Sequence, residues 1–211
     1  MVLLLICLPF AYAVYLYSSL PVSIPTHFNL EGQADSYGRR NSIFLAPCIL
    51  GGASLLVYLL LSNITKIDPK RYQKTDTGLY RNFALFMVAF LGCLSLGILY
   101  ISSHPGFQFE KFLLPSIGLL LAAIGVFMPR FHQNYFVGLR LPWTLDNEDN
   151  WNATHRMAGK VWIAGGICMA LTGFLLNKEM AGYFFFIMLI IMIAIPVVFS
   201  YNMFKNGNKI N

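Results

Sequence analysis

Six long stretches without Asp, Glu, Lys or Arg dominate this sequence of 211 residues and limit what the chain can fold into. A transmembrane helix needs about 20 mostly apolar residues, because that length crosses the hydrocarbon core of a bilayer. Trimmed at Pro, Gly and polar residues, the stretches predict helices at 2–20, 43–62, 82–102, 112–128, 160–176 and 183–201. The predicted fold is an all-α integral membrane protein with six transmembrane helices.

The composition excludes a soluble domain of any size. Hydrophobic residues make up 57% of the chain and charged residues only 11%, whereas soluble domains carry about 25% charged residues. The net charge of +6 does not indicate nucleic acid, because the basic residues are scattered over short loops. We interpret them as topology signals and as contacts to anionic membrane lipids.

The distribution of Lys and Arg predicts the orientation of the helices. If the N-terminus is cytoplasmic, eleven of the fifteen basic residues fall on the cytoplasmic side. These are Lys66, Lys70, Lys74, Arg71, Arg81, Arg130, Arg140, Arg156, Lys160, Lys205 and Lys209. The opposite side receives Arg39, Arg40, Lys111 and Lys178. Because short cytoplasmic loops are enriched in Lys and Arg, both termini are predicted to be cytoplasmic (N-in, C-in).

Two further features of the apolar stretches lead to expectations. Ala11-Tyr12-Ala13 resembles a signal-peptidase site, but no basic residue precedes it and apolar residues continue to Leu20, so we expect a retained helix. The four cysteines all fall inside apolar stretches and have no metal-ligand or redox spacing. We expect them to be buried packing residues.

The first motif, residues 20–38, lies in the first predicted outer loop (20–41). Pro21 and Pro25 end the preceding helix and favour an extended chain, and Gly32 and Gly38 permit tight turns. The segment is therefore predicted to be an ordered hairpin or cap. Its candidate ligand-contact residues are Pro21, Pro25, His27, Phe28, Asn29, Gly32, Asp35, Tyr37 and Gly38.

His27, Glu31 and Asp35 are the residues of this loop most capable of chemistry. On a helix their spacing would align three ligands for a metal, but the surrounding prolines and glycines argue against a helix. A neutral, hydrogen-bonded histidine that fixes the loop is the structural interpretation, and ligand contact is the functional one. No metal or cofactor is predicted.

The second motif, residues 134–162, lies in the predicted inner segment 130–160 and contains all three tryptophans. Trp favours the membrane interface. Asp149 or Asn150 could cap a short interfacial helix that starts at Trp151 and bends into the fifth span. The spacing places four residues on one face of this helix: Trp151, His155, Ala158 and Trp162.

The charges of the second motif allow two interpretations. Arg140, Arg156 and Lys160 could bind lipid phosphates, or they could join His155 and the acidic residues of 146–149 in a docking surface or polar network. The candidate functional residues are Asn134, Gly138, Arg140, Pro142, Trp143, Thr144, Trp151, His155, Arg156, Gly159 and Lys160.

Together the two motifs carry a family resemblance that spans essentially the whole chain. The pattern LPxxIPxHFNxxGxxDxYG at 20–38 is similar to the signature of a widespread bacterial membrane domain of unassigned function. The pattern NxFxGLRxPWT…W…THRxAGKxW at 134–162 resembles that of the SdpI-like family, the immunity proteins against the sporulation-delaying-protein toxin.

The resemblance implies a multi-pass protein of the bacterial plasma membrane that protects its cell from a secreted, membrane-active peptide toxin. It also implies receptor function, with signalling to a cytoplasmic transcriptional repressor, and no catalytic residues. The alternative is a small-molecule or lipid transporter, or an integral membrane enzyme. Coupled transport is disfavoured because no span carries Asp, Glu, Lys or Arg away from its ends.

We expect one membrane domain over residues 1–211. Within it, residues 1–65 would form a two-helix unit with the first motif, and 82–128 the third and fourth helices. Residues 129–204 would hold the second motif and the last two helices. The oligomeric state is left open by the sequence.

Overall fold

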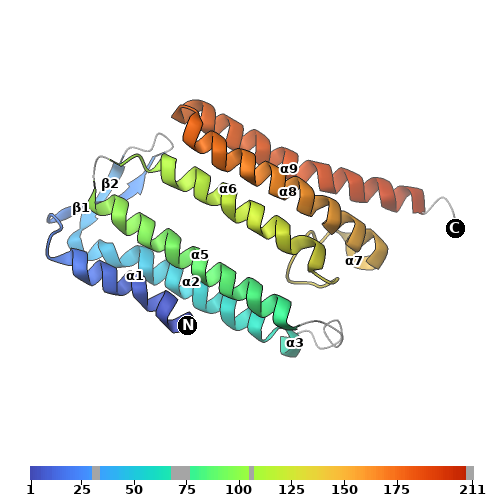
Figure 1. Cartoon of the computed structure of the whole chain (residues 1–211), viewed down its shortest axis with the longest axis horizontal. Helices are drawn as coiled ribbons and strands as arrows, with labels where there is room; N and C mark the ends of the chain where they lie inside the picture. The colour runs from blue at the N-terminus through green and yellow to red at the C-terminus, as the bar shows by residue number, and fades with distance from the viewer. Residues whose placement is uncertain (30–33, 68–76, 105–106, 208–211) are drawn as a thin grey trace. The chain divides into compact units, whose positions relative to one another are not determined.

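The computed structural model describes residues 1–29, 34–67, 77–104 and 107–207 of the chain (Figure 1). In the described part, five helices are long and apolar enough to cross a membrane, and a sixth apolar helix, α1, is shorter. The elements are α1 (Val2–Tyr17), β1 (Ser23–Phe28), β2 (Ala34–Arg39), η1 (Arg40–Phe44), α2 (Leu45–Ser62), α3 (Ile64–Ile67), α5 (Thr77–Ser103), α6 (Glu110–Phe127), η2 (Met128–Arg130), α7 (Pro142–Asp146), α8 (Glu148–Leu175) and α9 (Lys178–Gly207).

The predicted helices are confirmed as helices, with three corrections. The fold is mostly but not entirely helical, because β1 and β2 form an antiparallel hairpin. The predicted interfacial helix and fifth span form one continuous helix, α8, which begins before Trp151. Asn147, rather than Asp149 or Asn150, caps α8, because its side chain accepts the Asn150 N–H at 2.8 Å. The N-in, C-in orientation stays a prediction.

The described residues divide into two compact units, residues 1–67 with 77–112 and residues 113–207. In the first unit, α1 packs against α2 and α5, and α2 packs along α5 (Figure 1). In the second, α8 packs along α9, with α7 against both helices and η2 against α8. The single domain and its predicted subdivision stay predictions.

Small residues bring α6 and α8 into backbone contact in the second unit. A Cβ added to Gly166 would lie 2.5 Å from the Gly118 carbonyl oxygen and 2.5 Å from the Ala122 nitrogen. A Cβ at Gly125 would similarly lie 2.9 Å from the Gly159 carbonyl oxygen. Membrane helices associate through such close approach, since lipid supplies no hydrophobic drive between them.

The cysteine prediction is wrong. Cys7, Cys48, Cys93 and Cys168 are all free and exposed on the helix surfaces. Large apolar side chains such as Ile190, 66% exposed, share these surfaces. In a membrane protein the outward face is as apolar as the interior, so an apolar sequence context does not distinguish burial from lipid contact.

The contact between α6 and α8 leads to a stability prediction. Gly166→Ala is expected to destabilise the protein by about 1–3 kcal/mol, because the new Cβ meets backbone that cannot yield as a side chain would. The matched control is Gly182→Ala in α9, where an added Cβ meets nothing within 4 Å. Thermal unfolding in detergent measures both variants. Equal melting temperatures for the two would show that α6 and α8 are not in backbone contact.

Candidate functional site

The first motif forms the β-hairpin between α1 and α2. The strands pair antiparallel, with irregular register between Pro25 and His27 and between His27 and Phe28. Ile24 is 1% exposed and packs with the ends of the helices. The Arg40 N–H donates to the Val22 carbonyl at 3.0 Å where β2 leads into η1. The predicted ordered hairpin is therefore confirmed, and its base is fixed to the first unit.

His27 and Asp35 meet across the hairpin. The His27 Nδ1 lies 2.6 Å from an Asp35 carboxylate oxygen, and the two side chains are 69% and 41% exposed. An exposed pair of this kind contributes only about 0–1 kcal/mol to stability. The pair fixes the local side-chain geometry, yet leaves both groups accessible to a ligand.

The remaining residues of the first motif have different surroundings. Pro21 and Tyr37 are exposed, and Pro25, Asn29 and Gly38 are half-buried. A Cβ on Gly38 would collide with Ser42 Oγ and the Thr26 methyl group, so this glycine permits the hairpin to pack closely.

Three residues of the first motif are not completely described by the structure. Gly32 and Glu31 lie outside the described residues, and so does the Phe28 side chain. In the described parts of the chain, no three His, Cys, Asp or Glu side chains gather as metal ligands. A metal site that includes Glu31 is not tested by this finding.

The second motif comprises the segment between η2 and α8, with α7, and the first turns of α8. Asn134 is fully buried, and its side-chain oxygen accepts the N–H groups of Phe136 and Val137, each at 2.7 Å. Its side-chain amide donates to the His132 carbonyl at 2.7 Å. Asn134 thus replaces the backbone partners that a helix or sheet would supply to this turn.

His155 joins this loop to α8. Its Nε2 accepts the Leu139 N–H at 3.0 Å, and its Nδ1 lies 2.8 Å from the Trp151 carbonyl oxygen. The ring is therefore neutral, with its proton on Nδ1. It stacks on the Trp151 indole with ring centroids 4.0 Å apart. Gly138 has φ of 108°, and a Cβ there would collide with His155 Nε2.

Ser200 joins α9 to the same site. Its hydroxyl accepts the Trp143 indole N–H at 2.7 Å, and its carbonyl accepts from the Asn150 side chain at 3.0 Å. Thr144 Oγ1 in turn donates to the Leu139 carbonyl at 2.8 Å. The sequence reasoning did not single out Ser200, and it considered Asn150 only as a helix cap. The available signal was a hydroxyl inside an otherwise apolar helix, since such a group needs a partner in lipid.

The structure separates the predicted residues of the second motif into two groups. Asn134, Thr144, Trp151, His155 and Gly159 are buried, while Gly138 and Trp143 are half-buried. The exposed residues are Arg140, Pro142, Arg156 and Lys160. The predicted shared face on α8 is confirmed, because Trp151, His155 and Ala158 are buried and Trp162 half-buried.

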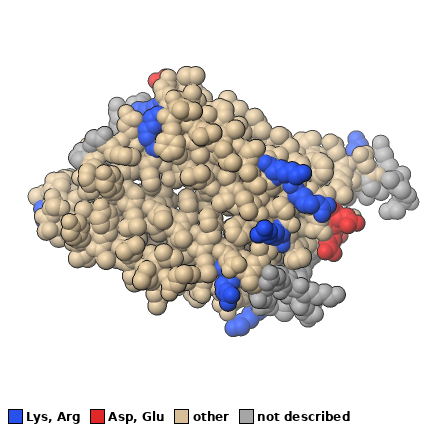
Figure 2. All heavy atoms as spheres, in the orientation of Figure 1, with Lys and Arg blue, Asp and Glu red and all other residues tan. Residues whose placement is uncertain are grey.

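The exposed residues of the second motif form a charged surface at the α7 end of α8. Figure 2 shows Lys and Arg side chains there beside a small acidic group. The acidic residues Asp146, Glu148 and Asp149 are exposed. The Arg140 guanidinium donates to the Tyr135 carbonyl at 2.7 Å, which orients it on the loop. This surface could bind lipid phosphates or a charged partner.

The geometry of His155 leads to a prediction. His155→Phe keeps the ring stacked on Trp151 but removes the acceptor of the Leu139 N–H, which should cost about 1–3 kcal/mol. Hydrogen exchange in lipid nanodiscs is expected to show roughly tenfold faster exchange at the Leu139 amide. The control is Arg156→Gln, because Arg156 is the exposed neighbour of His155. Unchanged protection in His155→Phe would rule out this hydrogen bond as the constraint on the loop.

Comparisons with known proteins match the two regions of the chain that hold the motifs. Residues 130–200 match the model of the SdpI/YfhL protein family, and residues 4–51 match a domain of unknown function (DUF1648). The chain is 27% identical over 212 residues to "Immunity protein SdpI" of Bacillus subtilis (strain 168), covering 98% of this chain and 97% of that protein. An uncharacterized protein of Archaeoglobus fulgidus is 31% identical over 58 residues, which is 28% of this chain and 32% of the relative. No solved structure matches. The resemblance inferred from the motifs is confirmed.

Proposed function

We propose that this multi-pass membrane protein, a member of the SdpI/YfhL family with an N-terminal DUF1648 domain, protects its cell from a secreted, membrane-active peptide toxin. The observation that carries the proposal is the extent of the similarity to an immunity protein. It covers 98% of the chain and therefore includes both motifs and all the apolar helices. Neither the matched family nor that relative is named as an enzyme.

The hairpin is proposed as the toxin-contacting site. The His27–Asp35 pair offers a hydrogen-bonding group held at 2.6 Å in an exposed position. On the same hairpin, Tyr37 is 62% exposed, and Val22 at its base is 78% exposed. Aromatic and apolar groups on the same hairpin as an oriented polar pair suit an amphipathic peptide. The apolar contacts would supply buried surface area, and the polar groups would orient the bound peptide.

The exposed charges of the second motif are proposed as the cytoplasmic face of the protein. Under the predicted N-in, C-in orientation, the hairpin lies outside and residues 130–160 lie inside. Arg140, Arg156 and Lys160 would then meet anionic lipid headgroups, or a transcriptional repressor held at the membrane. Signalling across the membrane would need two states of the protein that bind the toxin with different affinity.

Toxin survival tests the proposed function. The protein is expressed in a sensitive Gram-positive host that lacks its own immunity gene. The host is challenged with the sporulation-delaying peptide and with two unrelated membrane-active peptides. Selective protection against the first peptide is expected. Absence of protection, with the protein present in the membrane fraction, would contradict the proposal and favour a transporter or membrane enzyme.

Variants of the hairpin test where the toxin binds. His27→Ala and Asp35→Ala are each expected to abolish protection while membrane levels stay unchanged, because the exposed pair adds little to stability. The double variant should be no worse than either single variant if the two residues act as a unit. Ser36→Ala, an exposed position on the same strand, is the matched control. Wild-type protection by both single variants would remove the hairpin pair from the mechanism.

A further inference from the structure

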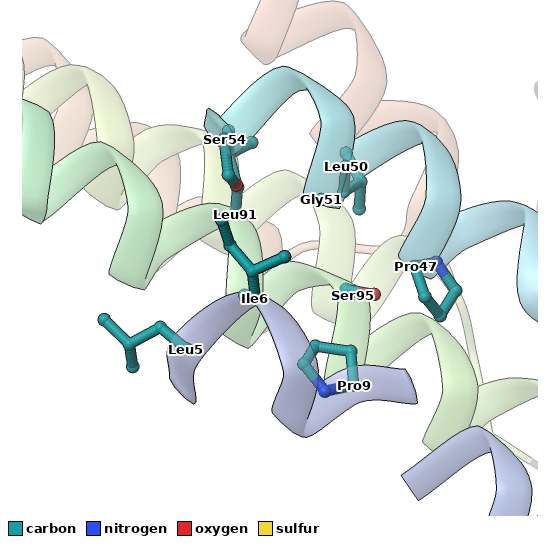
Figure 3. A pocket seen from close by; sticks show the side chains of 10 residues that line it. Leu5, Ile6, Pro9, Pro47, Leu50, Gly51, Ser54, Leu91 and Ser95 are labelled. Atoms are coloured by element: carbon teal, nitrogen blue, oxygen red, sulfur yellow. The ribbon is translucent and has the colours of Figure 1, made fainter. Parts of the chain in front are cut away.

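A small cavity with polar groups lies inside the first unit, between α1, α2 and α5 (Figure 3). Its volume is about 10 Å³, close to the roughly 10–15 Å³ that one water molecule requires. The lining includes Leu5, Pro9, Pro47, Ser54, Gly92 and Ser95. A space of this size suits a single water molecule.

Ser95 brings an unsatisfied hydroxyl to the cavity. The side chain is 1% exposed, and its Oγ has no hydrogen-bond partner among the described residues. Ser54, 2% exposed, lines the cavity from α2. A buried hydroxyl without a partner costs about 1–3 kcal/mol, so the site favours any molecule that can bond to it.

Leu5 contributes a second polar group. In a regular helix its carbonyl would accept the N–H of residue 9, but that residue is Pro9, which has no N–H. The carbonyl lies against α5, because a Cβ on Gly92 would be only 3.2 Å from its oxygen. Gly92 precedes Ser95 by about one helical turn, and Leu5, Gly92 and Ser95 all line the cavity.

We propose that this cavity binds one water molecule, which bridges the Ser95 hydroxyl and the Leu5 carbonyl that Pro9 deprives of its helical donor. Buried waters are stable when two to four polar groups surround them, and Ser54 is available as a third. The water hydrates the proline position of α1 without opening the unit to lipid. Because α1 leads directly into the hairpin, the hydrated position lies in the helix that carries the proposed toxin contact.

Radiolytic labelling in ¹⁸O water tests the site on the full-length protein in lipid nanodiscs. Bound water labels the side chains beside it, so ¹⁸O is expected at Leu5 or Pro9 in the wild type. Ser95→Val removes the hydroxyl and fills the space, which should lower that labelling roughly fivefold or more. The matched control is Ser102→Val, because the Ser102 hydroxyl already donates to the Ile98 carbonyl at 2.9 Å. Absence of label at Leu5 and Pro9 in the wild type, or labelling unchanged by Ser95→Val, overturns the proposal.

Thermal stability of Ser95→Ala gives a second readout that does not require cavity filling. If water satisfies the hydroxyl, the variant loses that bridge and melts at a lower temperature than the wild type. If the hydroxyl is left unpaired, its removal relieves a buried polar group and the melting temperature rises. A rise therefore overturns the proposed water site.

Discussion

Satisfying backbone polar groups in an apolar solvent is the constraint on which the rest of this structure depends. Helices meet it internally, whereas turns and loops buried inside the protein need partners from side chains. Asn134, Thr144 and His155 supply these partners to the segment before α8, through hydrogen bonds to backbone N–H and C=O groups. The hairpin solves the same problem by pairing its two strands.

This constraint changes the interpretation of the second motif. Its pattern contains histidine, asparagine, threonine and tryptophan, which suggests chemistry when seen in sequence alone. In the structure, Trp151 and His155 are buried and engaged in hydrogen bonds to Phe131 and Leu139 that hold the loop. The surface that remains for a partner is therefore smaller than the full motif. It consists mainly of exposed charged residues such as Arg156 and Lys160.

Local patterns in the sequence predicted most of the fold. Uncharged apolar stretches predicted the helices, two prolines and two glycines predicted the hairpin, and helical spacing predicted the shared face of Trp151 and His155. The missing features depend on contacts between residues far apart in the chain. No local pattern pairs Trp143 with Ser200, or distinguishes a lipid-facing cysteine from a buried one. For the hairpin, His27 and Asp35 meet in a stretch of irregular register that no local pattern predicted.

The bonds to Ser200 have a consequence for how freely α9 can change its sequence. Much of this helix exposes apolar side chains, including Ile187, Ile190 and Val198, and one apolar residue can replace another in contact with lipid at little cost. Ser200 is instead buried, and its hydroxyl accepts from the Trp143 indole, while its backbone carbonyl accepts from Asn150. A random mutational scan of α9 should therefore find tolerance at its lipid-facing positions and intolerance at Ser200 near its C-terminal end, where one hydroxyl links α9 to α7.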